Sequence, residues 1–410
     1  MELRPILSTL RRHKTAAALI VLETALSCAI ICNALFLISN RVERINLVSG
    51  VAEKELLRVQ LTGIGKDENA DALTKSDLAA LRGLPGVKSA TVTNQVPFVN
   101  SSWNSGVNMT KDQTHQTMNA TVYMGEDQFV NTFGLNLIAG RNFTPDEYVD
   151  WSLLDAPNSK VAIPSVIITR SMADKLFPGG NAVGKSFYSW GDEPIKVVGV
   201  VEHLVRPSDQ GGPEAKEYSM IFPIRGPYTL GGNYVIRTDP ERRAEVLKTA
   251  VDTLKRNGPN RIVLEDNTKS FEEMRNEFYQ QDRAMAWLLV VVCIALLVVT
   301  ALGIVGLASF WVQQRTRQIG VRRALGATRA QILRYFQMEN FLLASLGIVI
   351  GMLLAYAINQ LLMGKYELPR LPLYYLPIGA VALWLLGQIS VLGPALRAAA
   401  VPPAIATRSV

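Results

Sequence analysis

The segment FPGGNAVGKSF, residues 177–187, matches in full the pattern G-x-x-x-x-G-K-[ST] of nucleotide-binding phosphate loops. Gly179, Gly184, Lys185 and Ser186 occupy the four fixed positions of that pattern. In a working phosphate loop, backbone N–H groups and a helix N-terminus face the phosphates, while the lysine and the hydroxyl bind phosphate and Mg²⁺. These residue types are compatible with nucleotide binding. Whether the loop can bind a nucleotide depends on the strand and helix expected before and after it.

The elements around this segment do not suit a phosphate loop. The strand-like run SVIIT ends well before Gly179, and the helix-like stretch RSMADKLF stands between them. After Ser186 the sequence reads as strands with a turn, whereas a phosphate loop opens a helix. We therefore interpret the glycines as turn residues and predict that Gly179, Gly184, Lys185 and Ser186 bind no nucleotide.

Other side chains with reactive or metal-binding chemistry are few. Cys28 and Cys32 lie one helical turn apart, but two soft ligands without histidine or acid partners make a poor metal site. We expect them to act as small buried apolar residues. His115 and His203 are isolated in the sequence, so surface or packing roles are expected. The sequence predicts no catalytic residues and no metal, and the chain is not expected to be an enzyme by itself.

Four long apolar runs cover residues 16–38, 285–312, 341–363 and 373–396. Each reaches the roughly 20 residues that a helix needs to cross the hydrocarbon core of a bilayer. Basic residues concentrate before the first run and in the link between the second and third. Because positive loops stay in the cytoplasm, we expect both termini and this link inside, and the long polar stretch outside. The net charge of +7 reflects this topology rather than nucleic-acid binding. The basic residues that set the topology are Arg4, Arg11, Arg12, Lys14, Arg315, Arg317, Arg322, Arg323, Arg329, Arg334, Arg397 and Arg408.

The predicted fold class is an α-helical membrane protein with four transmembrane helices and an extracytoplasmic α+β domain of two lobes. Two β-α-β patterns flank a strand-rich middle, so we expect a split β-α-β lobe interrupted by an inserted lobe. Polar helical stretches at both ends of the outer domain read as stalks that continue the first and second spans. The expected segments are 1–15 (cytoplasmic N-terminus), 16–39 (first span), 40–283 (outer domain with stalk helices), about 54–94 with 230–268 (split lobe), about 95–228 (inserted lobe), 284–312 (second span), 313–336 (cytoplasmic coupling region), 337–363 (third span), 364–372 (short outer loop), 373–396 (fourth span) and 397–410 (cytoplasmic tail).

The cytoplasmic link carries a more specific pattern. RTRQIGVRRAL, residues 315–325, is predicted to form a short amphipathic helix on which Ile319, Val321 and Leu325 share an apolar side. Gly326 would end this helix. Its arginines can reach lipid phosphates or acidic groups of a partner. A plain basic cluster that holds anionic lipid is the alternative to a partner-binding helix, and both interpretations can apply to different arginines.

Glu23 lies deep in the first apolar run, where an acid is costly and often functional. Ser27 follows one helical turn later and Asn33 lies further along, so we expect a polar stripe that faces another helix. A hydrogen-bonded packing role is favoured for Glu23. Proton coupling is disfavoured because the sequence suggests no second buried charge.

The link QQRTRQIGVRRALGATRAQILRYF, residues 313–336, resembles the signature of the MacB/FtsX-type permeases of ABC transporters. The tail 393–408 and the outer stretches FGLNLIAGRNFT, LFPGGNAVGKSF and IKVVGVV are similar to the same family. The resemblance covers essentially the whole chain, as a MacB-like periplasmic core domain plus an FtsX-type transmembrane domain without a fused ATPase. A similar Gly-Lys-[ST] turn recurs in the outer domain of that family without binding ATP.

The resemblance implies a permease subunit that couples ATP hydrolysis by a separate cytoplasmic ATPase to a change of shape in its periplasmic domain. A separate ATPase is expected because only 15 residues precede the first span. Two permease copies, identical or related, are implied, with efflux or extraction of a periplasmic substrate as the outcome. No cofactor is expected in this chain, since the partner ATPase would bind ATP and Mg²⁺. By analogy with MacB, a membrane-fusion adaptor and an outer-membrane channel are implied as further partners. The coupling residues implied by the match are Arg315, Arg317, Ile319, Gly320, Val321, Arg322, Arg323, Leu325 and Gly326.

The expected location is the bacterial inner membrane, with the large domain in the periplasm. The alternative is an FtsX-like regulatory protein that activates a periplasmic partner without transport. The size of the two-lobed outer domain favours the transport interpretation. The sequence shows no cluster of aromatic or acidic residues in this domain that would point to a substrate class.

Overall fold

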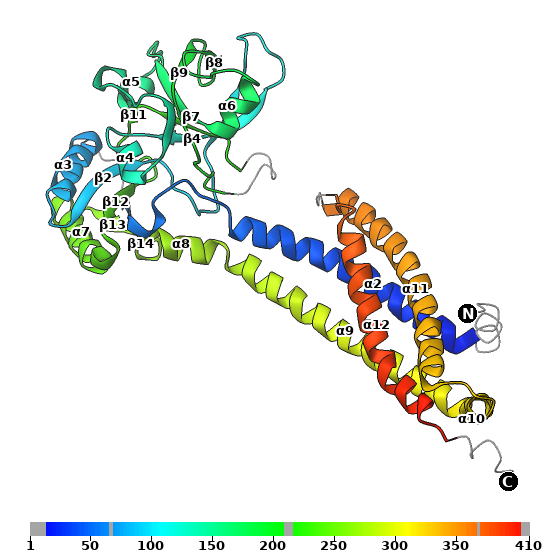
Figure 1. Ribbon diagram of the computed structural model, residues 1–410. Helices are drawn as coiled ribbons and strands as arrows, with labels where there is room; N and C mark the ends of the chain where they lie inside the picture. Colours follow the sequence, from blue (N-terminus) through cyan, green and yellow to red (C-terminus); the bar gives the residue numbers. More distant parts are fainter. Residues whose placement is uncertain (1–13, 65–68, 209–215, 367–369, 403–410) are drawn as a thin grey trace. The chain divides into compact units, whose positions relative to one another are not determined.

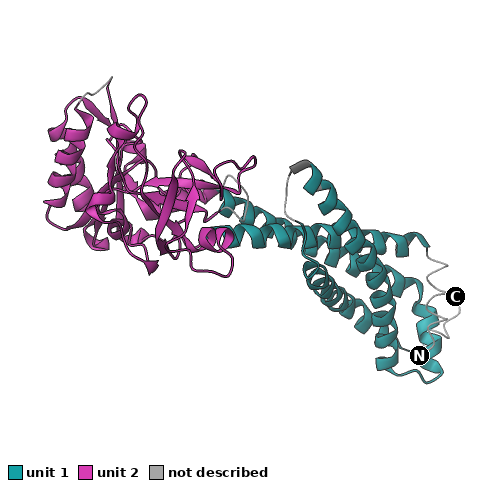
Figure 2. Cartoon of the chain, turned by 90° about the horizontal axis from the view of Figure 1, so that it is seen from above, with its two compact units in different colours: residues 1–46, 281–410 teal, residues 47–280 magenta. Residues whose placement is uncertain are grey.

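The computed structural model describes residues 14–64, 69–208, 216–366 and 370–402. The chain folds into two compact units (Figure 2), one of residues 1–46 with 281–410 and the other of residues 47–280. We call the first the membrane unit and the second the outer unit. Of the basic residues used to predict the topology, Arg4, Arg11, Arg12 and Arg408 lie outside the described ranges.

Among its described residues, the membrane unit has four helices that are long and apolar enough to cross a membrane (Figure 1). They are α2 (Lys14–Ile45), α9 (Gln280–Gln314), α11 (Arg329–Tyr366) and α12 (Tyr375–Ala399). A short helix, α10 (Thr316–Ala324), lies in the link between α9 and α11. Helix α11 begins at Arg329 rather than at 337, so the second half of the link is continuous with the third span. The four-helix part of the predicted fold class is confirmed.

Helix α2 packs closely on α11 through two glycines of α11. A Cβ atom at Gly347 would lie 2.9 Å from the carbonyl oxygen of Val21, and one at Gly351 would lie 2.6 Å from that of Ala25. Both distances are shorter than real Cβ contacts, so only glycine allows the two backbones to approach this closely. Their spacing is the G-x-x-x-G pattern of membrane helix pairs. The pattern is visible in the third span, but our sequence-based prediction did not use it.

The first lobe of the outer unit is built on a sheet with the strand order β13-β1-β12-β2, in which β14 also pairs with β1. All neighbouring strands in it are antiparallel. Its elements are β1 (Leu56–Gly63), α3 (Ala70–Arg82), β2 (Val87–Thr93), β12 (Asn233–Thr238), α7 (Arg243–Asn257), β13 (Arg261–Val263), β14 (Lys269–Ser270) and α8 (Phe271–Phe278). The two strands of each β-α-β unit are separated by a strand of the other unit. This is the split β-α-β arrangement that the sequence predicts.

The helices of this lobe are amphipathic and cover the sheet with their apolar sides. On α7, Val246, Ala250 and Leu254 are buried at four-residue spacing, which places them on one face. Asp77 on α3 is fully buried, where it pairs with the equally buried Arg261 of β13 and accepts a 2.6 Å hydrogen bond from the Tyr234 hydroxyl. An ion pair in this position requires all its partners in place, because an unpaired buried charge is costly.

The inserted lobe is a seven-stranded sheet with the order β3-β4-β10-β7-β9-β5, in which β8 also pairs with β9. Its elements are β3 (Asn104–Val107), β4 (Met118–Met124), α4 (Phe129–Phe133), β5 (Leu137–Gly140), β6 (Val149–Asp150), α5 (Trp151–Leu154), β7 (Ser165–Thr169), α6 (Arg170–Leu176), β8 (Ser186–Tyr188), β9 (Pro194–Val201), β10 (Ser219–Phe222) and β11 (Ile224–Arg225). A bridge between Asn108 and Tyr188, with reciprocal N–H···O distances of 2.9 and 2.8 Å, joins the end of β3 to β8. Six strands therefore form a closed ring, and the predicted strand-rich insertion is confirmed.

Candidate functional site

The loop that matches the phosphate-loop pattern is a turn between helix α6 and strand β8. Gly179 and Gly184 have positive φ angles of 70° and 89°, as turn glycines do. The loop amides already donate to carbonyl oxygens, since Gly184 N–H bonds to Val197 (2.8 Å) and Lys185 N–H to Ala182 (3.1 Å). Strand β8 begins at Ser186, so no helix opens at this loop. The loop therefore lacks the helix N-terminus that binds a phosphate, and the amides of Gly184 and Lys185 are already used.

The link between the second and third spans folds into α10, a turn and the start of α11. Gly326, with a φ angle of 94°, makes the left-handed turn that ends α10. Thr328 and Gln331 then form a reciprocal cap, with Thr328 N–H donating to Gln331 Oε1 (2.8 Å) and Gln331 N–H to Thr328 Oγ1 (3.3 Å). The signals of a helix stop followed by a helix start are local to the sequence, and the structure follows them.

The apolar residues of α10 lie on two faces rather than one. Ile319 is buried, and it packs with Val312, Ile332 and Phe336. Val321 is 44% exposed and Leu325 is 82% exposed. The prediction that these three share an apolar side is therefore wrong, because residues two apart on a helix point in nearly opposite directions. Ile319 anchors α10 to the membrane unit, whereas Val321 and Leu325 are left unpartnered.

The arginines of the link also separate into two sets. Arg315 is buried, and its Nη1 lies 2.9 and 3.1 Å from the carboxylate oxygens of Glu339 on α11. The prediction that the link arginines reach lipid or a partner is wrong for Arg315, which joins α9 to α11 instead. Arg323 donates to the carbonyl oxygen of Ala327 (3.0 Å), so it supports the turn.

Arg317 and Arg322 remain exposed on α10. Arg322 lies over the ring of Tyr335 at 4.9 Å, and neither arginine forms an ion pair within the described residues. Residues 317, 321 and 325 are four apart and therefore share one side of the helix, with Arg322 next to Leu325. We call Arg317, Val321, Arg322 and Leu325 the link surface. It presents two cations beside two exposed aliphatic side chains.

The polar residues of the first span make contacts with other helices. The Ser27 hydroxyl lies 2.7 Å from that of Thr300 on α9, and Asn33 Nδ2 donates to the Ala355 carbonyl oxygen of α11 (3.1 Å). Glu23 lies against Gly303 of α9, where a Cβ atom would collide with its carboxylate. Asn33 and Ser27 thus link α2 to two neighbours, while Glu23 occupies the space that a glycine leaves.

Two buried acids in the membrane unit were not identified from the sequence. Glu339 pairs with Arg315 as described, and Asp282 in the first turn of α9 pairs with Arg41 and Arg44 of α2. The premise that no second buried charge accompanies Glu23 in the sequence is therefore wrong for the membrane unit, although both acids are paired with arginine. Both acids are neutralised by arginine, so their arrangement is that of helix-to-helix contacts.

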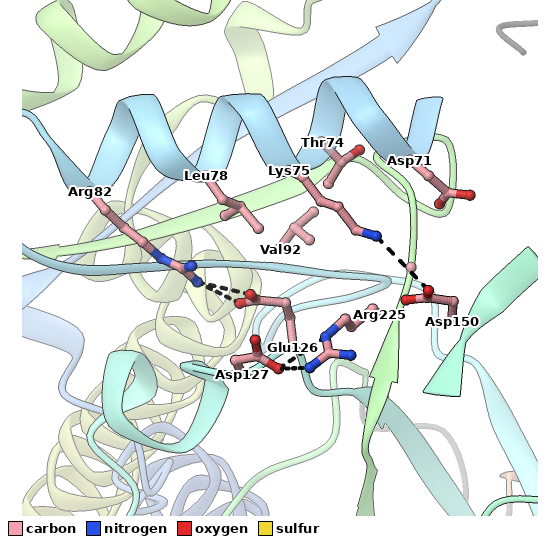
Figure 3. Close-up of a pocket in the computed structure, with 11 residues that line it drawn as sticks. Asp71, Thr74, Lys75, Leu78, Arg82, Val92, Glu126, Asp127, Asp150 and Arg225 are labelled. Carbon is pink, nitrogen blue, oxygen red and sulfur yellow. Dashed lines mark hydrogen bonds and ion pairs between the residues drawn. The ribbon is translucent and has the colours of Figure 1, made fainter. Parts of the chain in front are cut away.

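A pocket of about 200 Å³ lies between the two lobes of the outer unit (Figure 3). Arg82 of α3 reaches both carboxylate oxygens of Glu126 (2.9 and 2.7 Å), and Arg225 pairs with Asp127 (2.9 Å). Lys75 lies 3.9 Å from Asp150. Each base in the pocket has an acidic partner, which leaves little net charge for a ligand. The pairs of Arg82 and Lys75 join the two lobes, whereas Arg225 and Asp127 both belong to the inserted lobe.

Comparison with known proteins identifies two domains. The MacB-like periplasmic core domain matches residues 28–254, and the FtsX-like permease C-terminal domain matches residues 290–403. The ABC transporter permease YvrN of Bacillus subtilis (strain 168) is 25% identical over 296 residues, which cover 70% of this chain and 69% of that protein. The permease YknZ of the same organism is 23% identical over 346 residues, covering 82% of this chain and 79% of YknZ.

The macrolide export ATP-binding/permease protein MacB of Shewanella oneidensis is 26% identical over 301 residues. The match covers 70% of this chain but 41% of that MacB, so the chain spans about two fifths of such relatives. Two solved structures are also similar. One is the extracellular domain of YknZ from Gram-positive bacteria, with a TM-score of 0.31 and 19% identity, and the match covers 50% of this chain and 99% of that one. The other is the periplasmic region of MacB from Actinobacillus actinomycetemcomitans, with a TM-score of 0.33 and 16% identity, and the match covers 57% of this chain and 97% of that one.

The two domain matches agree with the architecture. The periplasmic core domain alone accounts for more than half of the chain. The permease domain covers most of α9 and all of α10, α11 and α12. The chain therefore belongs to the MacB/FtsX-type family of ABC transporter permeases.

Proposed function

We propose that this permease couples ATP hydrolysis by a separate cytoplasmic ATPase subunit to a change of shape in its outer unit, and so drives efflux or extraction of a periplasmic substrate. The observation that carries the proposal is the link surface. Leu325, directly after the last residue of α10, is 82% exposed, and unpaired arginines flank it. Arginine is enriched at protein interfaces, and the buried core of an interface is apolar, so a surface with both features suits a partner.

The proposed orientation follows from charge. Exposed arginines concentrate in the link and the start of α11, namely Arg317, Arg322, Arg329 and Arg334. Because basic segments stay on the cytoplasmic side, the link and both termini are assigned to the cytoplasm and the outer unit to the periplasm. The proposed membrane is the bacterial inner membrane.

The proposed partners follow from the family. The relatives YvrN and YknZ are named as permeases, and they match this chain over most of their length, which supports a separate ATPase that binds ATP and Mg²⁺. We infer that this chain has no catalytic role of its own. A second permease copy, and by analogy with MacB an adaptor and an outer-membrane channel, complete the proposed assembly.

The test is ATP hydrolysis by the full chain in lipid nanodiscs, alone and with the ABC ATPase subunit encoded beside it. We expect hydrolysis only with the ATPase. Arg317→Glu/Arg322→Glu should reduce the affinity of the two subunits by about tenfold or more, because each reversed charge removes a docking contact. Leu325→Asp should have a similar effect.

The matched control is Arg334→Glu, which reverses an exposed cation outside the link surface and should change the affinity by less than about twofold, as rim charges do. If Arg334→Glu lowered the affinity of the two subunits as much as the double variant does, and only in nanodiscs with anionic lipid, the arginines would bind lipid instead. Hydrolysis by the chain alone would contradict the non-catalytic role. Full activation of the ATPase without any transported cargo, together with altered cell-wall cleavage, would favour the regulatory alternative.

A further inference from the structure

Three tryptophans from distant parts of the sequence converge on the inserted lobe. Trp103 precedes β3, Trp151 begins α5, and Trp190 lies in the β8–β9 hairpin. Their ring centroids are 5.8 Å apart for Trp151 and Trp190, 6.1 Å for Trp103 and Trp151, and 6.2 Å for Trp103 and Trp190. The sequence shows no such cluster, because the three residues lie far apart along the chain.

The ring of strands holds this cluster in place. The Asn108–Tyr188 bridge runs antiparallel, so it brings the residues before β3 next to those after β8. Trp190 stacks on Phe222 at the end of β10, with centroids 5.6 Å apart and planes 20° apart. Trp190 has a φ angle of 57°, a left-handed conformation that is strained for a bulky side chain. Such outliers concentrate at functional sites, where the surrounding fold maintains them.

These aromatic rings are not fully covered. Trp103 and Trp190 are each 40% exposed. Trp151 and Trp190 form part of the wall of a cavity of about 570 Å³, together with Leu154, Val161, Ile163 and Ile195. Cavities of roughly 300–1,000 Å³ with mostly apolar walls are typical of small-molecule sites. The volume of this cavity lies within that range.

The charges that line this cavity favour a cation. Asp155, Asp192, Glu193 and Lys160 lie at its wall. Asp192 is already 3.4 Å from Lys111, but Asp155 and Glu193 form no ion pair among the described residues. Two carboxylates without partners thus face one lysine, and indole faces add their own attraction for positive charge.

We propose that this cavity binds an organic cation with an aromatic or aliphatic body, the body packing on Trp151 and Trp190 and the charge lying near Asp155 and Glu193. The proposal adds a ligand site to the permease and does not depend on the ATP-driven cycle. Indole rings supply a large apolar area at little conformational cost, and the carboxylates select the charge of the ligand.

The experiment is titration calorimetry on the full chain in nanodiscs of zwitterionic lipid, with empty nanodiscs subtracted to remove partitioning into the bilayer. The probes are 4-phenylbutylamine, 4-phenylbutanol and 4-phenylbutyrate, which share one apolar body and differ in charge. We expect saturable binding in the order amine, alcohol, carboxylate, with the amine bound about threefold or more tighter than the alcohol.

Two variants separate the contributions. Asp155→Asn/Glu193→Gln should bring the amine to the affinity of the alcohol while leaving alcohol binding unchanged. Trp151→Leu should weaken both probes by about tenfold, since it removes the stacking surface but keeps an apolar side chain in α5. Binding no stronger than to empty nanodiscs would overturn the proposal. An unchanged amine preference in the double variant would also overturn it, because the carboxylates would then have no role.

Discussion

Neighbouring acids at the contact between the two lobes allow a direct test of how burial sets the strength of an ion pair. Glu126 and Asp127 each pair with an arginine in the same pocket (Figure 3). The Glu126 side chain is 8% exposed, whereas the Asp127 side chain is 46% exposed. Replacing each by alanine therefore changes the same kind of contact in two different environments.

The expected costs follow from the contacts. Glu126 accepts from one arginine nitrogen, Nη2 of Arg82, with both oxygens, so we count one charge-assisted interaction of roughly 1.5–3 kcal/mol. It also accepts a 3.2 Å hydrogen bond from Thr91 Oγ1, which contributes about 1 kcal/mol. Glu126→Ala should therefore cost about 3 kcal/mol. Asp127→Ala should cost about 0–1 kcal/mol, because exposed pairs are weakened by water and salt.

Hydrogen–deuterium exchange on the full chain measures both variants, because it resolves the strands of the outer unit from the membrane helices. A loss of 3 kcal/mol corresponds to about 100-fold faster exchange of the protected amides in β2 and β4, and a loss of 1 kcal/mol to about fivefold. High salt should remove the effect of Asp127→Ala and leave that of Glu126→Ala. Equal effects of the two variants would refute the reasoning that burial decides the strength of these pairs.

Two further predictions concern backbone approach and pH. Gly351→Ala should destabilise the packing of α2 on α11 by roughly 1–3 kcal/mol, since its Cβ would lie 2.6 Å from the Ala25 carbonyl oxygen. The control is Gly306→Ala, because a Cβ atom at Gly306 meets nothing within 4 Å. It should leave the melting temperature in nanodiscs unchanged or raise it. Equal melting temperatures of the two variants would contradict the close packing of α2 on α11. A hydrogen bond from Arg141 lowers the pKa of Glu147 to about 2 from an ordinary value of 4.5. The pair of Arg141 and Glu147 stabilises its loop fully above pH 4.5 and loses this contribution as the pH falls toward 2. Protection of the loop amides from exchange should therefore fall between pH 4.5 and pH 2 in the wild type but not in Glu147→Gln.

The membrane helices and the split lobe were predictable because their signals are local. An apolar run as long as 285–312 must be buried or span a bilayer whatever lies beside it. Strand and helix patterns with their turn residues likewise identify the two β-α-β units at either end of the outer domain. The G-x-x-x-G spacing of Gly347 and Gly351 belongs to the same class of signal, since it can be read from a single span.

The roles of individual arginines could not be predicted from the link alone. Arg315 and Arg317 are two residues apart in a uniformly basic segment, yet the first is buried and the second is exposed. What separates them is Glu339, which lies 24 residues further along the chain on the facing side of α11. Only the packing of the junction between α9 and α10 against the start of α11 makes that acid available. Tertiary context therefore decides which charges form contacts within the chain and which are left for partners.

The tryptophan cluster shows the same limit more strongly. Nothing in the residues around Trp103, Trp151 or Trp190 relates one to another, since they belong to three connections that the strands of the ring separate. Their convergence depends on the closure of that ring through the bridge between Asn108 and Tyr188. A ligand site made in this way is assembled by sheet topology rather than by a motif. In the segment with a nucleotide-binding motif, by contrast, the Lys185 amide bonds within the turn and the Gly184 amide bonds to strand β9. In this chain, the recognisable pattern therefore marks a structural loop, and the cavity with binding chemistry has no sequence pattern at all.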